Sequence, residues 1–101
     1  MKFENAHEHR GSFFSVLAQT PLSQVGVMTL RPGQDAGAPE IHSGDQFVYI
    51  IEGEADVEVA GEKGTMKQGD IVIVPKGAEH HVANNGKEPL FFLTVYTPPQ
   101  Y

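Results

Sequence analysis

The 101-residue chain contains no cysteine, and this absence alone removes several classes of protein. Disulfide-stapled folds, thiolate metal sites and cysteine nucleophiles are all excluded. Lysine and arginine are scarce as well, at seven residues against thirteen aspartates and glutamates, for a formal charge of −6 with histidine neutral. The basic residues gather into no patch, so we expect no nucleic acid and no anionic membrane surface as a partner.

Long apolar runs are also missing. No stretch approaches the length of a membrane span, and the first ten residues, MKFENAHEHR, lack the apolar core of a secretion signal. We therefore expect a soluble, cytoplasmic protein. A chain of this length has room for one domain, so residues 1–101 are predicted to form a single unit.

Helical periodicity is the third absence. From Gly11 onward, no window keeps apolar residues at helical spacing without meeting one of the many glycines and prolines. Short β-branched and aromatic runs recur instead, as in sandwiches and barrels, and predict an all-β fold, a small antiparallel β-barrel. The predicted strands are Phe13–Leu17, Gln24–Leu30, Pro39–His42, Phe47–Ile51, Ala55–Val59, Thr65–Lys67, Ile71–Val74, His80–Ala83 and Leu90–Tyr96.

The turns and the strand patterns agree with a barrel. Glu52-Gly53-Glu54 and Ala60-Gly61-Glu62 have the composition of hairpin tips. Ala55–Val59 alternates apolar and polar residues, which predicts one face in water. Phe47–Ile51 and Ile71–Val74 are apolar at nearly every position, so we expect both of their faces to be covered.

Potential metal ligands crowd one short segment, Pro39-Glu-Ile-His-Ser-Gly-Asp-Gln46. In an extended strand, Glu40 and His42 point to the same face because they are two residues apart. Ser43-Gly44-Asp45 is typical of a turn, which would bring Gln46 back beside them. His80 comes from a distant strand and would enclose an ion from the opposite side.

The region around His80 contains a motif with fixed spacing. Gly69 is followed after five residues by Pro75-Lys76-Gly77, then after two residues by His80, and after three more by Asn84. This arrangement resembles the second motif of the cupin superfamily, and the resemblance extends over most of the chain. It implies a small single-domain cupin, with the jelly-roll β-barrel of that superfamily.

The first cupin motif is present in altered form. The usual pattern is His-x-His, a short gap, Glu, six residues and Gly; here Glu40, His42, Gln46 and Gly53 stand at those positions. The resemblance implies Glu40, His42, Gln46 and His80 as ligands of one divalent transition metal ion. The carboxylate has moved from one corner of the site to another, so the ligands still carry one negative charge.

Oxygen and nitrogen ligands alone are compatible with Mn, Fe, Ni, Zn or Co and disfavour Cu(I). Glu40, His42 and His80 form a two-histidine, one-carboxylate set, which keeps ferrous oxygen chemistry possible. A hydrogen-bonded network around water, without any metal, is the alternative interpretation. His81 is expected to be structural or at the surface, and Asp45 to be a turn residue.

Strand alternation predicts the pocket lining. If Gln46 and His80 point inward, so do the residues two and four positions further on, which are Val48, Ile50, Val82 and Asn84. The last strand has two possible registers, with either Phe92, Thr94 and Tyr96 or Phe91, Leu93 and Val95 facing in. The sequence does not choose between them, and Met28 is equally undecided.

Resemblance to cupins implies a metal-dependent enzyme acting on a small oxygenated molecule, sugar-like or a hydroxy or keto acid, by isomerisation or proton transfer. A non-catalytic, metal-dependent binding module and an Fe(II)-dependent dioxygenase are the alternatives. No catalytic base is identified. Phe47, Tyr49 and Ile51 alternate with the inward set and form an apolar face, from which we expect a homodimer.

Overall fold

The computed structural model describes all 101 residues and is built almost entirely of strands. The chain order begins with a short 3-10 turn, η1, over Ala6–His9. The strands are β1 Phe14–Thr20, β2 Ser23–Leu30, β3 Asp45–Glu52, β4 Ala55–Val59, β5 Glu62–Met66, β6 Ile71–Val74, β7 His80–Ala83 and β8 Leu90–Thr97. The all-β prediction is therefore confirmed.

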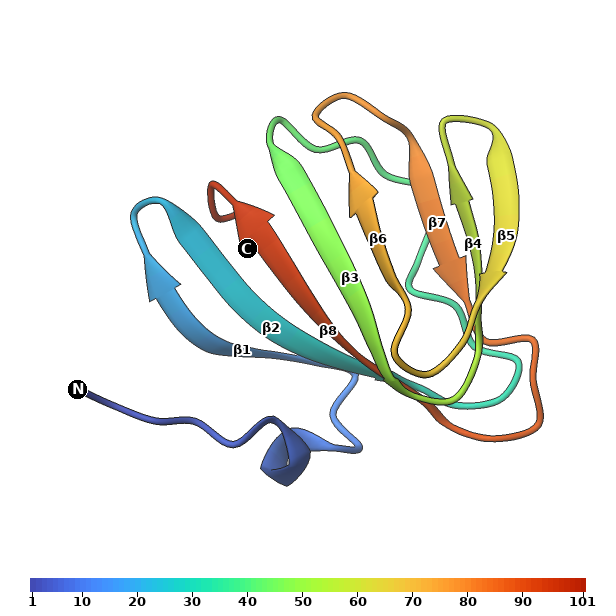
Figure 1. Cartoon of the computed structure of the whole chain (residues 1–101), viewed down its shortest axis with the longest axis horizontal. Coiled ribbons are helices and arrows are strands. Elements are labelled where there is room, and N and C mark those ends of the chain that lie inside the picture. Colours follow the sequence, from blue (N-terminus) through green and yellow to red (C-terminus); the bar gives the residue numbers. More distant parts are fainter.

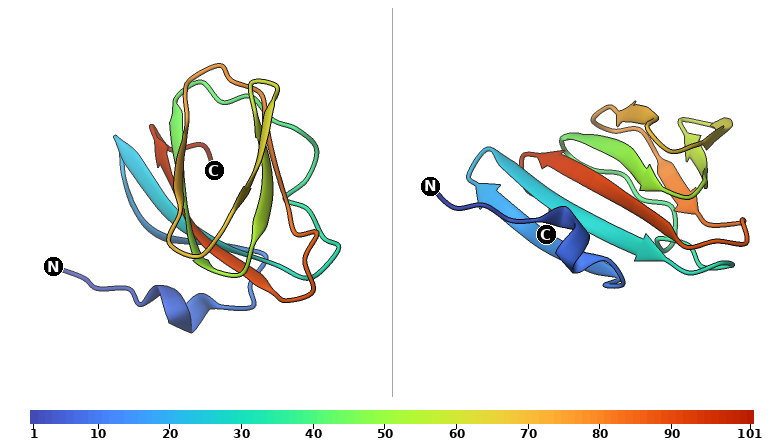
Figure 2. Two further views of the ribbon diagram at one scale, coloured as in Figure 1. Left: turned by 45° about the vertical axis from the view of Figure 1, so that its right-hand side comes forward. Right: turned by 60° about the horizontal axis from the view of Figure 1, so that its bottom comes forward.

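Two antiparallel sheets make up the barrel. The larger sheet has the strand order β1-β2-β8-β3-β6, and the smaller has the order β5-β4-β7. The two sheets face each other across a common interior, which Figures 1 and 2 show from different sides. The crossing connections give the jelly-roll arrangement of a closed, small barrel.

Alternation along β3 shows how the sequence builds this interior. Gln46, Val48 and Ile50 are buried, whereas Phe47 and Tyr49 between them are exposed. A period of two places one set of side chains inside the barrel and the other outside. The inward set joins residues of both sheets in one hydrophobic core: Met28, Leu30, Val48, Ile50, Ala55, Val57, Met66, Val82, Leu90 and Phe92.

Most of the predicted strands are present in the structure, some with the predicted bounds and others with shifted bounds. Ala55–Val59, Ile71–Val74 and His80–Ala83 have the predicted bounds, and the other strands shift by a few residues. The predicted strand Pro39–His42 is wrong, because this segment makes a single isolated bridge, between Glu40 and His80. No ladder continues on either side of this bridge, because the next main-chain bonds run from Ala36 N–H to Val82 O and from Gly77 N–H to His42 O, out of register with a regular strand pair.

The tip between β4 and β5 confirms the predicted hairpin. Val59 pairs with Glu62, and the two residues between them, Ala60 and Gly61, both have positive φ, at 51° and 84°. A two-residue loop with two positive φ values matches the right-handed twist of the flanking strands.

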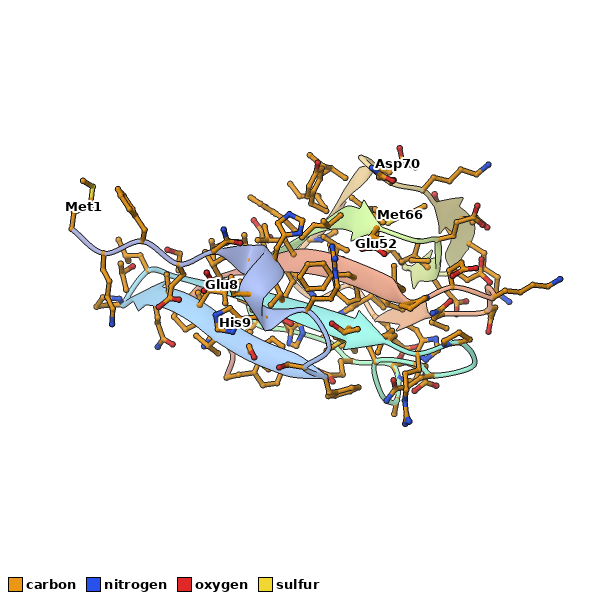
Figure 3. All side chains as sticks on the ribbon, turned by 90° about the horizontal axis from the view of Figure 1, so that it is seen from below. Met1, Glu8, His9, Glu52, Met66 and Asp70 are labelled. Atoms are coloured by element: carbon orange, nitrogen blue, oxygen red, sulfur yellow. The ribbon has the colours of Figure 1, made fainter.

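The amino-terminal segment lies across the outer face of β8 (Figure 3). The His7 ring lies 6.1 Å from the Phe91 ring, and the Arg10 guanidinium lies 5.2 Å above that ring. Arg10 also forms an ion pair with Glu52 at 2.7 Å. Because this segment covers it from outside, Phe91 is buried although it faces away from the barrel interior.

The prediction that Ile71–Val74 is covered on both faces is wrong for the isolated chain. Ile71 and Ile73 are 69% and 56% exposed, because β6 is the end strand of its sheet and nothing in the chain packs on its outer face. They pair with Tyr49 and Phe47 of β3, which are also exposed. We call Phe47, Tyr49, Ile71 and Ile73 the outer patch. None of the helical structure is long and apolar enough to cross a membrane.

Candidate metal centre

The proposed ligands reach the barrel interior from three places in the chain. Glu40 and His42 lie on the extended segment between β2 and β3, Gln46 is the second residue of β3, and His80 opens β7. Main-chain bonds hold these elements together: Glu40 N–H donates to His80 O at 3.0 Å, and His80 N–H donates to Glu40 O at 2.9 Å. The N–H of Gly77, in the turn between β6 and β7, donates to His42 O at 3.0 Å.

The two imidazoles lie side by side. His42 and His80 are both 8% exposed, and their ring centroids are 4.9 Å apart. His80 Nδ1 is 3.2 Å from the Ala78 carbonyl oxygen, which orients the ring and leaves Nε2 available. Burial, together with the neighbouring His80, lowers the pKa of His42. His42 therefore stays neutral at neutral pH, the form in which imidazole binds a metal.

The Gln46 side chain forms hydrogen bonds through its amide nitrogen, whereas its amide oxygen has no hydrogen-bond partner. Nε2 donates to Thr94 Oγ1 at 2.9 Å and lies 3.4 Å from Tyr96 Oη. Oε1 has no hydrogen-bond partner and is the single buried side-chain polar atom in this condition. Buried oxygens are nearly always paired, so this oxygen is free to bind a partner from outside the chain, such as a water molecule or an ion.

Glu40 lies at the rim of the site. Its Oε2 is 3.6 Å from His42 Nε2 and accepts a hydrogen bond from the Tyr101 hydroxyl at 2.7 Å. Burial and the bond to Glu40 raise the pKa of Tyr101. The sequence contained no signal for Tyr101, because a residue distant along the chain enters the site through tertiary contacts alone.

Tyr96 is the second tyrosine at the site. It is 4% exposed, and its ring lies 5.4 Å from the His42 ring. Burial raises the pKa of Tyr96, so its hydroxyl keeps its proton at neutral pH. Sequence reasoning left Tyr96 undecided with the register of its strand.

The structure selects one of the two registers of β8. Phe92, Thr94 and Tyr96 face the interior, at 2%, 0% and 4% exposure. Met28, the other undecided residue, also borders the interior cavity. The amino-terminal segment covers Phe91 on the opposite side, which is why both faces of this strand are apolar.

A cavity of about 40 Å³ lies among the proposed ligands, and Glu40, His42, Gln46 and His80 all border it. Of the four predicted lining residues, Val82 borders this cavity, whereas Val48 and Ile50 pack in the hydrophobic core. The Asn84 side chain is bonded to main-chain atoms instead. Its Nδ2 donates to the carbonyls of Leu30 and Glu88 at 2.9 and 2.8 Å, and its Oδ1 accepts from Gly86 N–H at 3.0 Å.

The other histidines lie elsewhere. His81 points away from the cluster toward Asp35, with Nε2 to Oδ2 at 3.3 Å, and His9 lies 3.5 Å from Glu4. No three His, Cys, Asp or Glu side chains in the chain converge as a ready metal-binding group. The candidate centre differs from such a group because one of its four donors is an amide and its carboxylate is turned toward Tyr101.

The chain is a small β-barrel with histidines from two segments gathered inside it. Comparison with known proteins identifies the family to which such a barrel belongs. Residues 26–96 match the model of the cupin domain family. The chain therefore belongs to the cupins, as the two sequence motifs predicted.

Two relatives and one solved structure show how far this likeness extends. An uncharacterised protein of Bacillus subtilis, YrkC, is 30% identical over the whole of this chain and 58% of its own length. A gentisate 1,2-dioxygenase of Ralstonia is 36% identical over 74% of this chain. The crystal structure of TT1209 from Thermus thermophilus superimposes with a TM-score of 0.87 at 26% identity, over 97% of this chain and 98% of TT1209.

The coverage limits what these relatives imply. This chain spans 58% of YrkC and 21% of the dioxygenase, so it matches only part of a longer protein in both cases. The comparisons establish a cupin domain and leave its ligand and reaction to be inferred from the site.

Proposed function

We propose that Glu40, His42, Gln46 and His80 hold one divalent transition metal ion, drawn from Mn, Fe, Ni, Zn and Co. The observation that carries this proposal is the unpaired Gln46 oxygen. Its amide nitrogen is bonded to Thr94, so the oxygen is directed to the interior beside the imidazoles of His42 and His80. A metal ion gives this buried oxygen the partner that the protein does not supply.

The donor set fits such an ion chemically. Two imidazoles, one carboxylate and one amide oxygen carry a single negative charge, so a divalent ion leaves the site with one positive charge. When bound, the ion would act as a Lewis acid toward an oxygen of a substrate. The His80 ring is already oriented by its bond to the Ala78 carbonyl, as metal-binding histidines usually are.

The activity that this centre supports best is a metal-dependent isomerisation or proton transfer on a small oxygenated molecule, sugar-like or a hydroxy or keto acid. Tyr96 supplies the proton-bearing group that the ligands themselves lack. Its hydroxyl is buried, protonated at neutral pH and 3.4 Å from Gln46 Nε2. It is positioned beside the Gln46 amide to donate a hydrogen bond to a substrate oxygen.

A ferrous dioxygenase is the second candidate, and one comparison favours it. The dioxygenase relative from Ralstonia is 36% identical over 74% of this chain. Glu40, His42 and His80 would supply the two histidines and one carboxylate that such iron centres use.

Metal analysis tests the proposal. The protein is purified without a polyhistidine tag, and its metal content is measured before and after incubation with Mn, Fe, Ni, Zn and Co salts. We expect one ion per chain with at least one of them. Substoichiometric binding of every metal would contradict the proposal, and turnover that requires oxygen would select the dioxygenase over the isomerase. Tight metal binding with no turnover would identify a binding module.

We also propose that the barrel forms a homodimer through the outer patch. Tyr49 and Phe47 are about two-fifths exposed, and Ile71 and Ile73 are exposed beside them. A single chain rarely leaves such a contiguous apolar face in water, and a two-fold axis lets the same patch cover itself. Ile51, the third residue of the predicted interface, is half-buried in the isolated chain.

A further inference from the structure

The chain beyond β8 turns back over the opening of the barrel. In the left view of Figure 2, the segment that ends at the label C enters the space between the two sheets. Gly44 lets this segment pass, because a Cβ at that position would collide with the main chain of Thr97 and the ring of Pro98. Residues 98–101, which we call the tail, therefore approach the metal centre from its open side.

A buried amide holds the tail in place. Gln24 on β2 is fully buried, and its Oε1 accepts from the N–H groups of Gln100 and Tyr101 at 3.2 and 3.1 Å. Its Nε2 donates to the main-chain oxygen of Tyr101 and to Gln19 Oε1. Both donors to the Gln24 oxygen come from the tail, so this buried group loses them if the tail leaves.

The tail places the Tyr101 ring at the mouth of the cavity. Three rings surround it edge to face: Tyr96 at 5.2 Å, Phe14 at 5.4 Å and His42 at 6.0 Å between centroids. Its hydroxyl donates to Glu40 Oε2 at 2.7 Å. An aromatic ring with one hydroxyl group is thus contacted by three neighbouring rings and bound through its oxygen.

We propose that Tyr101 occupies the binding site of an aromatic hydroxyl compound, a phenol, and that the tail must be displaced for such a ligand to bind. The proposal deepens the proposed function, on which it rests for the role of Glu40 as a metal ligand. The site recognises the ligand by the same contacts that Tyr101 makes: surrounding rings for the aromatic group and the Glu40 carboxylate for the hydroxyl.

Two further observations support displacement. The cavity that remains beneath the tail is about 40 Å³, room for one water molecule and too small for a ring. Tyr101 itself is 57% exposed, so its displacement leaves the hydrophobic core closed and costs the two hydrogen bonds to Gln24 Oε1. The closed tail then weakens the apparent affinity for a ligand in proportion to the fraction of open molecules.

The test compares phenol with cyclohexanol, which has a similar size and one hydroxyl but no aromatic ring. Binding to wild type, Tyr101→Ala and Tyr101→Phe is followed by chemical-shift changes of the backbone amides around Glu40 and His42. We expect Tyr101→Ala to bind phenol at least tenfold more tightly than wild type, and cyclohexanol at least tenfold more weakly than phenol. Tyr101→Phe keeps a ring in the site and should bind phenol with an affinity between the other two.

The outcomes separate this inference from the proposed metal centre, because metal content is measured in the same samples. Phenol binding to Tyr101→Ala without bound metal would support the inference and contradict the metal centre. Full metal occupancy with phenol affinities within twofold in all three proteins would overturn the inference alone. Equal affinities for phenol and cyclohexanol would overturn the ligand class. A fall in melting temperature of more than about 5 °C in Tyr101→Ala would overturn it too, because Tyr101 would then be a structural residue.

Discussion

Gln46 Nε2 donates to Thr94 Oγ1 at 2.9 Å, and this bond sets the direction of the whole Gln46 amide. Thr94 is fully buried on the neighbouring strand β8, so the acceptor has no freedom to turn toward solvent. With its nitrogen used in this way, the amide presents only its oxygen to the interior. A neutral side chain thereby takes the position where the cupin motif has a carboxylate.

Replacing Gln46 with Glu is expected to tighten metal binding by about tenfold or more, because a second carboxylate cancels the remaining positive charge of the loaded site. The same charge weakens polarisation of a bound substrate, so turnover should fall as affinity rises. Competition with a chelator measures the affinity. A companion variant, Thr94→Val, removes the acceptor that orients the Gln46 amide and should weaken metal binding. If Gln46→Ala and Gln46→Glu both stay within about twofold of wild type, Gln46 is not a ligand.

Removal of either imidazole is expected to abolish stoichiometric metal binding. His42→Ala and His80→Ala each delete one of the two nitrogen donors while leaving the strand ladders intact. His81→Ala is the matched control, since His81 neighbours His80 in sequence but points toward Asp35. Elemental analysis and circular dichroism check metal content and fold. Equal metal loss in His81→Ala would show that the effect is not specific to the proposed ligands.

Asn84→Ala is expected to lower the free energy of unfolding by about 2–3 kcal/mol, because it leaves the buried Leu30 carbonyl without its donor and removes two further hydrogen bonds. The side-chain nitrogen donates to the Leu30 and Glu88 carbonyls, and the side-chain oxygen accepts from Gly86 N–H. Metal affinity should not change under conditions in which both the variant and the wild type are fully folded. Urea unfolding gives the stability, and a change of more than threefold in metal affinity would place Asn84 at the site after all.

Gly53→Ala is expected to destabilise the barrel by more than about 2 kcal/mol, through positive φ and steric overlap together. Gly53 has φ +89°, and a Cβ there would meet the Pro89 carbonyl. Gly61→Ala is the control, because Gly61 has φ +84° but open space around it. It should cost only about 1–2 kcal/mol, the penalty of the left-handed conformation alone. Equal losses by thermal unfolding would mean that the contact with Pro89 is relieved at no cost.

Tyr49→Asp is expected to shift the protein from dimer to monomer, since it places a charge in the middle of the outer patch. Light scattering at micromolar concentration should report about twice the chain mass for wild type. Leu22→Asp is the control, because Leu22 is 80% exposed in the β1–β2 turn, away from the patch. A wild type that stays monomeric at every concentration would contradict the proposed interface.

Local chemistry determined much of this protein from sequence alone. The two-residue loop Ala60-Gly61 and the alternation of Ala55–Val59 specify a hairpin with one face in water, because both signals lie within a few residues. The motif around His80 identifies the family, and family spacing named Glu40, His42 and Gln46 together. These predictions depend on short-range patterns and on a resemblance, neither of which requires knowing which distant segments meet.

Features that depend on contacts between distant segments were determined by the tertiary structure alone. Both faces of β8 are apolar, so its register depends on the amino-terminal segment that covers Phe91 from outside. β6 is apolar on both faces too, yet no other segment of the chain packs on its outer face, and Ile71 and Ile73 stay exposed. Tyr101 reaches Glu40 across 61 residues of sequence, through a tail held by the buried amide of Gln24. No local periodicity encodes such a contact, because its partners become neighbours only after the barrel has closed.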